Sequence, residues 1–287
     1  MLNCALFSFR DVFEWENNDE HPMIKCRVSS EMKSNNRMQV LITGGSSGIG
    51  LELAKQFAVD GYEILLVASN EERLLRAKKM LTHQYSVPVS TYTFDLAKQG
   101  MAERLYEAVK ADGHVIDVLV NNAGIGTIGA TEEIPLVKDE ALMMLNMMAP
   151  VVLTKLFLRE MYGRKTGRIL NVCSTGAYQP GPYTATYYAS KSFLLSYTKA
   201  VRFESKQHGV SVCALCPGTT DTGFFTRADS KTPKGAMSAE KVASYAYKHF
   251  MRGKAEIIPG LSFRLMKLCP VSIKTAVVAW VKRPKSS

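Results

Sequence analysis

At residues 38–50 the sequence reads MQVLITGGSSGIG, an apolar run that breaks into a glycine-rich turn. The run 38–42 predicts a strand, and residues 51–59 after the turn have helical character. A strand, a glycine turn and a helix in this order are typical of a dinucleotide-binding βα unit. The glycines allow a tight turn and bring the helix N-terminus close to a pyrophosphate, where free N–H groups and the helix dipole favour negative charge. We therefore expect a dinucleotide to contact Gly44, Ser46, Ser47, Gly48, Ile49 and Gly50.

The alternation of strand-like and helical segments continues along the chain. Further strands are predicted at residues 62–68, 88–94, 116–120, 167–174, 210–215 and 255–258, and helices at 74–81, 99–110, 137–162, from Tyr187 to about His208, and at 239–252. Steady alternation without a repeat or linker argues for one parallel sheet covered by helices on both faces. We predict an α/β fold, a single domain with a doubly wound parallel sheet of about seven strands.

The segments outside this alternation differ in composition. Residues 1–37 mix acids, Asn, Ser and isolated aromatics without a period, which predicts a poorly packed N-terminal extension, with a docked arm as the alternative. The folded domain is expected at 38–260. Within it, residues 219–238 lack a clear period, and a loop of that length is typical of a lid or a disordered segment. Residues 261–287 form an apolar, basic C-terminal tail.

Composition limits the class of protein. Hydrophobic residues make up 46% of the chain and charged residues 22%, as in soluble globular proteins. We find no secretory signal, no apolar run of the ~18 residues that span a bilayer, and no disulfide framework among the 6 cysteines, so we expect a cytoplasmic protein. The net charge is +10, and residues 257–287 contain basic residues but no acid. This charge suits a solvated end or a patch for acidic ligands, nucleic acid or anionic lipid; of these partners we do not expect nucleic acid.

A candidate acid–base pair lies in the stretch Tyr187-Tyr188-Ala189-Ser190-Lys191. On a helix, Tyr187 and Lys191 share one face, one turn apart. A free phenol, with a pKa near ~10, is a poor acid or base at neutral pH, and a nearby ammonium lowers that pKa. We therefore expect Tyr187 to donate or accept a proton. Tyr188 lies about 100° further around the helix and would not share the Lys191 face.

Other motifs accompany this pair in a fixed order. They are Thr43-Gly44-x-x-x-Gly48-x-Gly50, Asp95 after the third strand, Asn121-Asn122-Ala123-Gly124, Asn146, Ser174, Tyr187-x-x-x-Lys191, and Pro217-Gly218 with Thr222. With this set the chain, over about residues 38–260, resembles the short-chain dehydrogenase/reductase family. The resemblance implies a single-domain Rossmann fold and an enzyme that transfers a hydride between a nicotinamide cofactor and a carbonyl or secondary alcohol.

The resemblance also implies a role for each catalytic candidate. Tyr187 would be the general acid/base on the substrate oxygen, and Lys191 would lower the Tyr187 pKa and hold the nicotinamide ribose. Ser174 would orient the substrate oxygen, and Asn146 would fix a water that links Lys191 to solvent. Hydride transfer builds negative charge on that oxygen, which a hydroxyl and a phenol stabilise. Two alternatives remain: Asn146 as a bridge between backbone groups, and Ser174 as a hydrogen-bonding residue at a strand end.

The expected cofactor is NADP, with NAD as the alternative. An acid at the end of the second strand would repel the 2′-phosphate of NADP, whereas this sequence has Ser69-Asn70 there. No Arg occupies the position, and Glu71 and Glu72 are close by. By resemblance, further cofactor contacts come from Asp95, Leu96, Asn122, Ala123, Gly124, Tyr187, Lys191, Pro217, Gly218 and Thr222. Turn geometry is the alternative for Asn121, Ala123 and Gly124, and capping of the lid is the alternative for Thr222.

The substrate pocket is expected to be largely apolar. Its candidate segments are residues 125–128, residues 176–183 and the lid with Phe224 and Phe225, with Gln179 as a polar exception. They suggest an apolar carbonyl or secondary alcohol, unless they merely pack the lid. We therefore predict an NADP(H)-preferring oxidoreductase. The alternatives are a 3-oxoacyl thioester reductase of lipid synthesis and a dinucleotide-binding sensor without turnover.

Four further expectations concern partners, metals and cysteines. The tail, whose apolar residues lie among basic ones, could rest on a membrane surface as a peripheral contact, although Pro270 interrupts a continuous helix. The helices that carry Asn146 and Tyr187 often form subunit faces in the family, so we expect a homo-oligomer. We expect no metal, because no ligand set is visible. We also expect no redox role for Cys213-x-x-Cys216, because strand residues three apart point to opposite faces.

Overall fold

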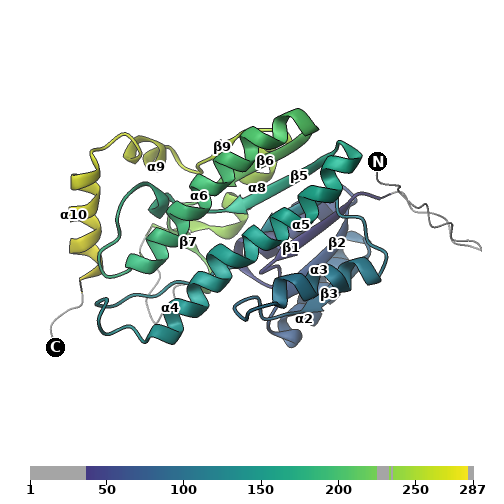
Figure 1. The fold of residues 1–287 in the computed structure, drawn as a ribbon, viewed down its shortest axis with the longest axis horizontal. Coiled ribbons are helices and arrows are strands. Elements are labelled where there is room, and N and C mark those ends of the chain that lie inside the picture. Colours follow the sequence, from purple (N-terminus) through teal and green to yellow (C-terminus); the bar gives the residue numbers. More distant parts are fainter. Residues whose placement is uncertain (1–36, 225–232, 234, 284–287) are drawn as a thin grey trace, which may run out of the picture. The chain divides into compact units, whose positions relative to one another are not determined.

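The computed structural model of the chain describes residues 37–224, 233 and 235–283. The predicted extension at residues 1–37 lies outside this part except for Arg37, as does the middle of the predicted lid. The described residues form an α/β fold with one large sheet and helices on both of its faces (Figure 1).

The large sheet confirms the predicted fold class. Its seven strands are all parallel and run in the order β3-β2-β1-β4-β5-β6-β9. The chain starts near the middle of the sheet, winds to one edge and then returns to wind to the other, which makes the sheet doubly wound. The strands are β1 (Gln39–Thr43), β2 (Glu63–Ala68), β3 (Val89–Thr93), β4 (Val118–Asn121), β5 (Gly167–Val172), β6 (Val210–Leu215) and β9 (Glu256–Ile257).

Two helical layers cover the two faces of this sheet (Figure 1). Strand residues alternate between them: Val40 and Ile42 pack into one core, and Leu41 between them packs into the other. One core is shared with α1 (Gly48–Val59), α2 (Glu71–Tyr85) and α8 (Ala239–Met251). The other is shared with α3 (Met101–Ala111), α5 (Ala149–Arg164) and α6 (Ala185–Ser205). Burial on both faces explains why the strands read as continuous apolar runs.

The predicted helix at 137–162 is interrupted by a wider turn. It consists of α4 (Leu136–Met143), a π-helical turn (Met144–Met148) and α5. By length and composition, the helical stretch Leu136–Arg164 is the one in the described part of the chain that could cross a membrane. However, α5 packs on the sheet through Leu153, Phe157 and Met161, as the core helix of a globular domain does. The π turn carries Asn146, and such turns occur often at functional sites.

Short elements follow β5 and β6. A 3₁₀ turn (Thr175–Tyr178) comes directly after Ser174, so the predicted strand at 167–174 is wrong in its last two residues. The reason is that the Ser174 side chain accepts a hydrogen bond from the backbone N–H of Gly176 and starts the turn. The ends of the predicted lid form the strands β7 (Thr220–Asp221) and β8 (Met237–Ser238), which pair with each other.

The C-terminal tail forms two helices, α9 (Leu261–Met266) and α10 (Val271–Lys282), coloured yellow in Figure 1. Pro270 immediately precedes α10, as expected for a residue that cannot continue a helix. Two basic side chains dock the tail on the domain. Lys267 bonds to Glu256 in β9, and the buried Lys274 donates to the carbonyl oxygen of Tyr178 at 3.2 Å. Part of the basic charge of the tail therefore acts inside the fold.

Candidate active site

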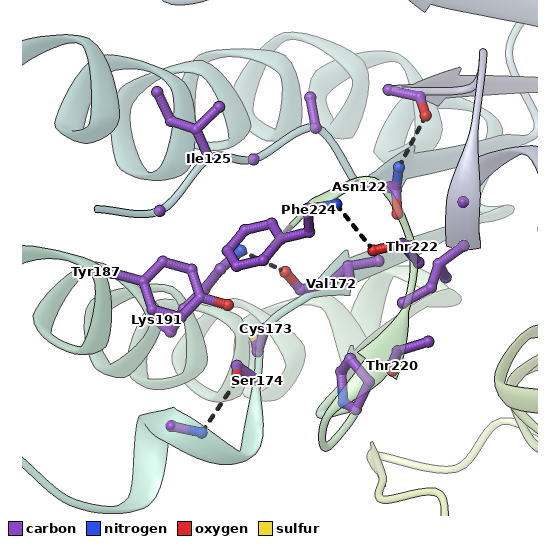
Figure 2. Close-up of a pocket in the computed structure, with 18 of the residues that line it drawn as sticks. Asn122, Ile125, Val172, Cys173, Ser174, Tyr187, Lys191, Thr220, Thr222 and Phe224 are labelled. Carbon is purple, nitrogen blue, oxygen red and sulfur yellow. Dashed lines mark hydrogen bonds between the residues drawn. The ribbon is translucent and has the colours of Figure 1, made fainter. Parts of the chain in front are cut away.

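A cavity of about 520 Å³ opens at the carboxyl ends of the strands β1 to β6. In open α/β sheets this edge is where ligands bind. Figure 2 shows part of the cavity wall. The cavity is lined by nearly all the residues assigned from the sequence to cofactor binding or catalysis, namely Gly44, Ser46, Ser47, Gly48, Ile49, Ser69, Asn70, Asp95, Leu96, Asn122, Ala123, Gly124, Ser174, Tyr187, Lys191, Pro217, Gly218 and Thr222. Gly50 and Asn146 are the two exceptions.

The glycine turn leaves no room for side chains. Gly44 and Gly48 have φ angles of +64° and +56°, which residues with a Cβ rarely adopt. Gly50 is constrained by space instead: a Cβ there would lie 2.4 Å from the carbonyl oxygen of Gly44 and from Nδ2 of Asn122. Gly50 thus allows the close approach of α1 to the turn, and its position favours this packing role over the expected contact with the cofactor.

The N-terminus of α1 suits a bound phosphate. Ser47, the residue before the helix, makes no side-chain capping bond, and the first turn contains no acidic residue. The first N–H groups of a helix have no partner within it, and together with the helix dipole they attract an anion. The turn and helix end therefore fit the pyrophosphate of a dinucleotide.

Asn122 and Thr43 fasten the loops after β1 and β4 to each other. The Thr43 hydroxyl accepts hydrogen bonds from the backbone N–H groups of Asn122 and Ala123, both at 3.0 Å. The Asn122 amide donates to the carbonyl oxygens of Thr43 and Gly44 at 2.9 and 3.1 Å. The neighbouring Asn121 points into the sheet and is buried. The Asn122 amide therefore shapes the turn, and Asn122, Ala123 and Gly124 line the cavity.

Near the end of β2, the sequence interpretation missed one residue of the cavity wall. Arg73 lines the cavity beside Ser69 and Asn70. The helix α2 begins at Glu71, with the Asn70 side chain accepting a bond from the Arg73 N–H, so Arg73 sits in its first turn. Recognition of Asn70 as a helix cap would have revealed this placement, whereas the helix was expected only from residue 74. Glu72 pairs with Arg76 at 2.8 Å.

The catalytic candidates Ser174 and Tyr187 come together at the opposite end of the cavity. Ser174 follows β5, Tyr187 lies in the first turn of α6, and both side chains line the cavity, with the Ser174 hydroxyl close enough to oppose the rise in the pKa of Tyr187. Ser174 also accepts the Gly176 N–H at 3.0 Å, which fixes its hydroxyl. Two hydroxyls in the wall of one cavity can stabilise the negative charge that develops on a substrate oxygen bound between them.

The expectation that Lys191 lowers the pKa of Tyr187 is not met. Burial raises the pKa of Tyr187 to about 12, and the nearby Ser174 hydroxyl opposes this only in part. The Lys191 ammonium donates to the carbonyl oxygen of Val172 at 2.9 Å and lies 5.9 Å from the centre of the Tyr187 ring (Figure 2). Burial also lowers the pKa of Lys191. Loss of water around the phenol is therefore the largest cause of the shift in the pKa of Tyr187.

Asn146 makes the contacts expected of a structural bridge. Its Oδ1 accepts the N–H of Ile125 at 3.0 Å, and its Nδ2 donates to the Ile125 carbonyl at 2.9 Å and to the Ser190 hydroxyl at 3.1 Å. These bonds tie the loop after β4 to α6. They support the backbone-bridging alternative, and the role of Asn146 in holding a water stays a prediction. A Cβ on Gly124 would lie 3.2 Å from Oδ1 of Asn146 and 3.4 Å from Nζ of Lys191, so these groups converge on one point.

The substrate end of the cavity is mostly apolar, as expected. Residues 125–128, Gly176, Gln179 and Phe224 line it, whereas the expected Phe225 lies outside the described residues. Thr222 accepts the N–H of Phe224 at 3.2 Å, which is the capping role kept as an alternative (Figure 2). The tail also contributes to this wall, which the sequence did not reveal, through Phe263, Met266, Val277, Val278, Val281 and Lys282.

Cys213 and Cys216, the two cysteines of the C-x-x-C motif, lie in different cores and do not pair with each other. Cys213 packs into the core shared with α1, whereas Cys216 packs with Cys173 in a third core, because their strand positions face opposite sides. Burial raises the pKa of Cys213 to about 12, which disfavours its reactive thiolate. Within residues 37–224, 233 and 235–283, no group of three or more His, Cys, Asp or Glu could hold a metal ion.

Comparison with known proteins identifies the family. The family model described as short chain dehydrogenase matches residues 38–233, so the chain belongs to the short-chain dehydrogenase family. A putative ketoacyl reductase of Streptomyces coelicolor is 37% identical over 187 residues, 63% of this chain and 70% of that protein. The chain is a short-chain NAD(P)-dependent dehydrogenase/reductase, as the sequence motifs predict.

Solved structures agree with this assignment. A short-chain dehydrogenase from Sphingobium yanoikuyae, in complex with NADPH, superposes with a TM-score of 0.75 at 27% identity and covers 87% of this chain and 98% of its own. The bulky-bulky ketone specific alcohol dehydrogenase from Comamonas testosteroni superposes with a TM-score of 0.72 at 26% identity and covers 88% and 98%.

Proposed function

We propose that the protein is an NADP(H)-preferring carbonyl reductase or alcohol dehydrogenase that acts on a bulky, apolar ketone or secondary alcohol. The observation that carries this proposal is that Ser174, Tyr187 and Lys191 line the same cavity as the glycine turn. The bound dinucleotide supplies or accepts the hydride. The chain itself holds the substrate oxygen between two hydroxyls and moves a proton at the Tyr187 oxygen.

The raised pKa of Tyr187 supports reduction as the direction that the site favours at neutral pH. A phenol with a pKa near 12 is protonated at pH 7 and is ready to donate a proton to the oxygen that gains charge. Ser174 donates or accepts a second hydrogen bond at that oxygen. Lys191 contributes positive charge from a position 5.9 Å from the centre of the Tyr187 ring.

The preference for NADP rests on the end of the cavity beside β2. Ser46, Ser69 and Arg73 line this corner, and a guanidinium and hydroxyls are good partners for a 2′-phosphate. The acids that the sequence places nearby, Glu71 and Glu72, do not line the cavity. The Sphingobium relative was solved with NADPH, which fits the same preference.

The apolar wall supports a bulky substrate. The rings of Tyr187 and Phe224 lie 5.3 Å apart between centroids, and α10 adds valine side chains. The Comamonas relative is described as specific for bulky-bulky ketones, in line with such a wall. A second candidate, a 3-oxoacyl thioester reductase, is favoured by the similarity to the Streptomyces protein. Faster turnover of acyl-carrier thioesters than of free ketones would select this second candidate.

The function can be tested with a matched pair of variants, Tyr187→Phe and Tyr188→Phe. Both remove one hydroxyl from neighbouring residues of α6. We expect Tyr187→Phe to lower kcat for ketone reduction about a hundredfold to ten-thousandfold, and Tyr188→Phe to have a small effect. NADPH binding, followed by fluorescence, should survive in both. Wild-type turnover in Tyr187→Phe would contradict the mechanism, and NADPH binding without turnover of any ketone by the unsubstituted protein would favour the sensor.

We further propose that the protein is cytoplasmic and that it touches an anionic membrane surface through its tail. Several apolar side chains of α9 and α10 are exposed, among them Trp280 at 83%, and the only charged residues of these helices are basic. Sedimentation with phosphatidylserine vesicles should carry the protein down at low salt and less so after Trp280→Ala. Equal sedimentation of both proteins, or none, would contradict the proposal.

We also propose a homo-oligomer. Exposed apolar side chains on α4–α6 are Leu136, Val137, Met148, Phe193 and Phe203, and a face of this kind is typical of a subunit interface. Sedimentation velocity should show a species larger than 31.8 kDa that dissociates after Phe203→Asp. A monomer at micromolar concentration would contradict this proposal.

A further inference from the structure

The carboxamide of Gln179 is a polar group in the apolar wall of the cavity. Gln179 is the residue directly after the 3₁₀ turn that begins beyond Ser174, and it lines the same cavity as Tyr187. Its side chain is only 8% exposed, and its Oε1 is buried without a hydrogen-bond partner. A buried polar group without a partner costs about 1–3 kcal/mol, so such groups are rare and call for an explanation.

A second polar group without a hydrogen-bond partner, a hydroxyl, lines the cavity from the loop after β4. Thr127 is 9% exposed, and its Oγ1 is also buried without a partner. The two segments are tied together, because the Thr184 hydroxyl donates to the Thr127 carbonyl at 2.8 Å and the Gly129 N–H donates to the Tyr183 carbonyl at 2.9 Å. The two unpaired groups therefore lie on two loops that hydrogen bonds join to each other. The loop with Gln179 leads directly into the helix that carries Tyr187.

The backbone that carries Gln179 is held firmly. The Lys274 ammonium from α10 donates to the carbonyl of the preceding residue, Tyr178, at 3.2 Å. The Tyr178 hydroxyl donates to Glu256 in β9 at 2.9 Å, and the Thr175 N–H donates to the Pro217 carbonyl at 2.9 Å. Two bonds to the backbone and one to the Tyr178 side chain therefore fix the turn that ends beside Gln179, and the Gln179 side chain lines the cavity from this fixed position.

We propose that Gln179 is a specificity-determining residue that receives a second hydrogen-bonding oxygen of the substrate, a hydroxyl group carried by the ketone. A hydroxyl can donate to the amide oxygen and accept from the amide nitrogen, and so satisfies a carboxamide that has no partner. Thr127 is the second group that such a hydroxyl meets. The inference rests on the proposed function and narrows its substrate class from an apolar ketone to an apolar hydroxyketone. A site built to bond a hydroxyl rejects the analogue that lacks it, because its own polar groups are then left unpaired.

The experiment compares ketones that differ only in the hydroxyl. The probes are valerophenone and its derivatives hydroxylated at the third, fourth or fifth carbon, assayed with NADPH. The variant is Gln179→Leu, of similar size, and the matched control is Gln99→Leu, at an exposed position outside the cavity lining. For the best hydroxyketone, kcat/KM should fall about tenfold or more in Gln179→Leu and stay unchanged in Gln99→Leu. For valerophenone it should change less than twofold, and NADPH affinity should be the same in all three proteins.

The outcomes separate this inference from the proposed function. An equal loss of kcat/KM for valerophenone and the hydroxyketones would make Gln179 a structural residue and overturn the inference. The inference would also be overturned if the unsubstituted protein reduced valerophenone as efficiently as every hydroxyketone, although the proposed function would then stand. If the unsubstituted protein binds NADPH but reduces none of the ketones, the proposed function fails and the inference fails with it.

Discussion

The two ends of the cavity are built in opposite ways. The cofactor end consists of a turn that is continuous in sequence and of loops fastened by hydrogen bonds from the Asn122 side chain to backbone carbonyls, with glycines where any extra atom would collide. The substrate end is assembled from loops and helices far apart in sequence, including α10, and contains polar atoms without partners. The cofactor end therefore has one permitted shape, whereas the substrate end can change with single side chains. This difference explains how one fold can keep its cofactor and vary its substrate.

The largest expected effect concerns the turn at the cofactor end. In Gly50→Ala the new Cβ would lie 2.4 Å from the Gly44 carbonyl oxygen, so the turn or α1 must shift. We expect a loss of about 1–3 kcal/mol in the free energy of unfolding, with NADPH binding lost or strongly weakened. Thermal unfolding and NADPH titration measure both.

The matched control for this change is Gly163→Ala in α5, where an added Cβ meets nothing within 4 Å. That variant should be as stable as the unsubstituted protein or slightly more so, because Ala favours a helix. If the two variants were equally stable and bound NADPH equally well, the turn would have more than one permitted shape.

The second prediction tests Tyr187, where the two ends meet. Because burial raises the pKa of Tyr187 to about 12, the phenol stays protonated from pH 7 to 9. Reduction, which needs the protonated phenol, should be independent of Tyr187 ionisation over this range. Oxidation of the alcohol needs the phenolate, whose fraction rises tenfold per pH unit, so kcat/KM for oxidation should rise about a hundredfold. A flat profile for oxidation would show that the phenol ionises well below pH 7 in the working complex.

The third prediction tests the choice between NADP and NAD. Arg73→Ala removes the guanidinium from the corner beside Ser69 and should raise the Kd for NADPH about tenfold or more, with the Kd for NADH changed little. Isothermal titration with both cofactors measures the ratio. Arg104→Ala is the control, because Arg104 is exposed in α3 and does not line the cavity or the pocket beside Arg73. A preference for NADH in the unsubstituted protein would contradict the assignment of NADP.

The smallest expected effect concerns the tail at the substrate end. Lys274→Met removes the ammonium that holds α10 to Tyr178 and leaves the rest of the helix unchanged. We expect KM for a bulky ketone to rise a few fold, with kcat and NADPH affinity unchanged, because the loss is confined to the substrate wall. Lys241→Met, at an exposed position in α8, is the control. An effect of Lys274→Met on NADPH affinity would show that the two ends are not independent.

The sequence was a good guide to elements whose signals are local. The strand 210–215 was predicted with its observed bounds, and the strand before the glycine turn was placed within one residue. Boundaries failed where a side chain changed the local hydrogen bonding, as at Ser174, which starts a turn, and Asn70, which starts α2 three residues before the expected helix. The π turn around Asn146 was missed because its signal is tertiary: the Asn146 amide bonds to the loop at Ile125.

The sequence by itself determined the family, the parallel sheet and most of the residues that meet at its carboxyl edge, because most motifs follow an apolar strand and parallel strands end at one edge, whereas Asn146, Tyr187 and Lys191 are carried by helices. Only the tertiary structure decided three further features. It placed Arg73 in the cavity, since this depends on where α2 begins. It docked α10 as a wall of the substrate end, since the contacts involve residues about 100 positions apart, such as Lys274 and Tyr178. It set the pKa of Tyr187, because removal of water from a phenol depends on everything packed around it and not on its neighbours in the chain.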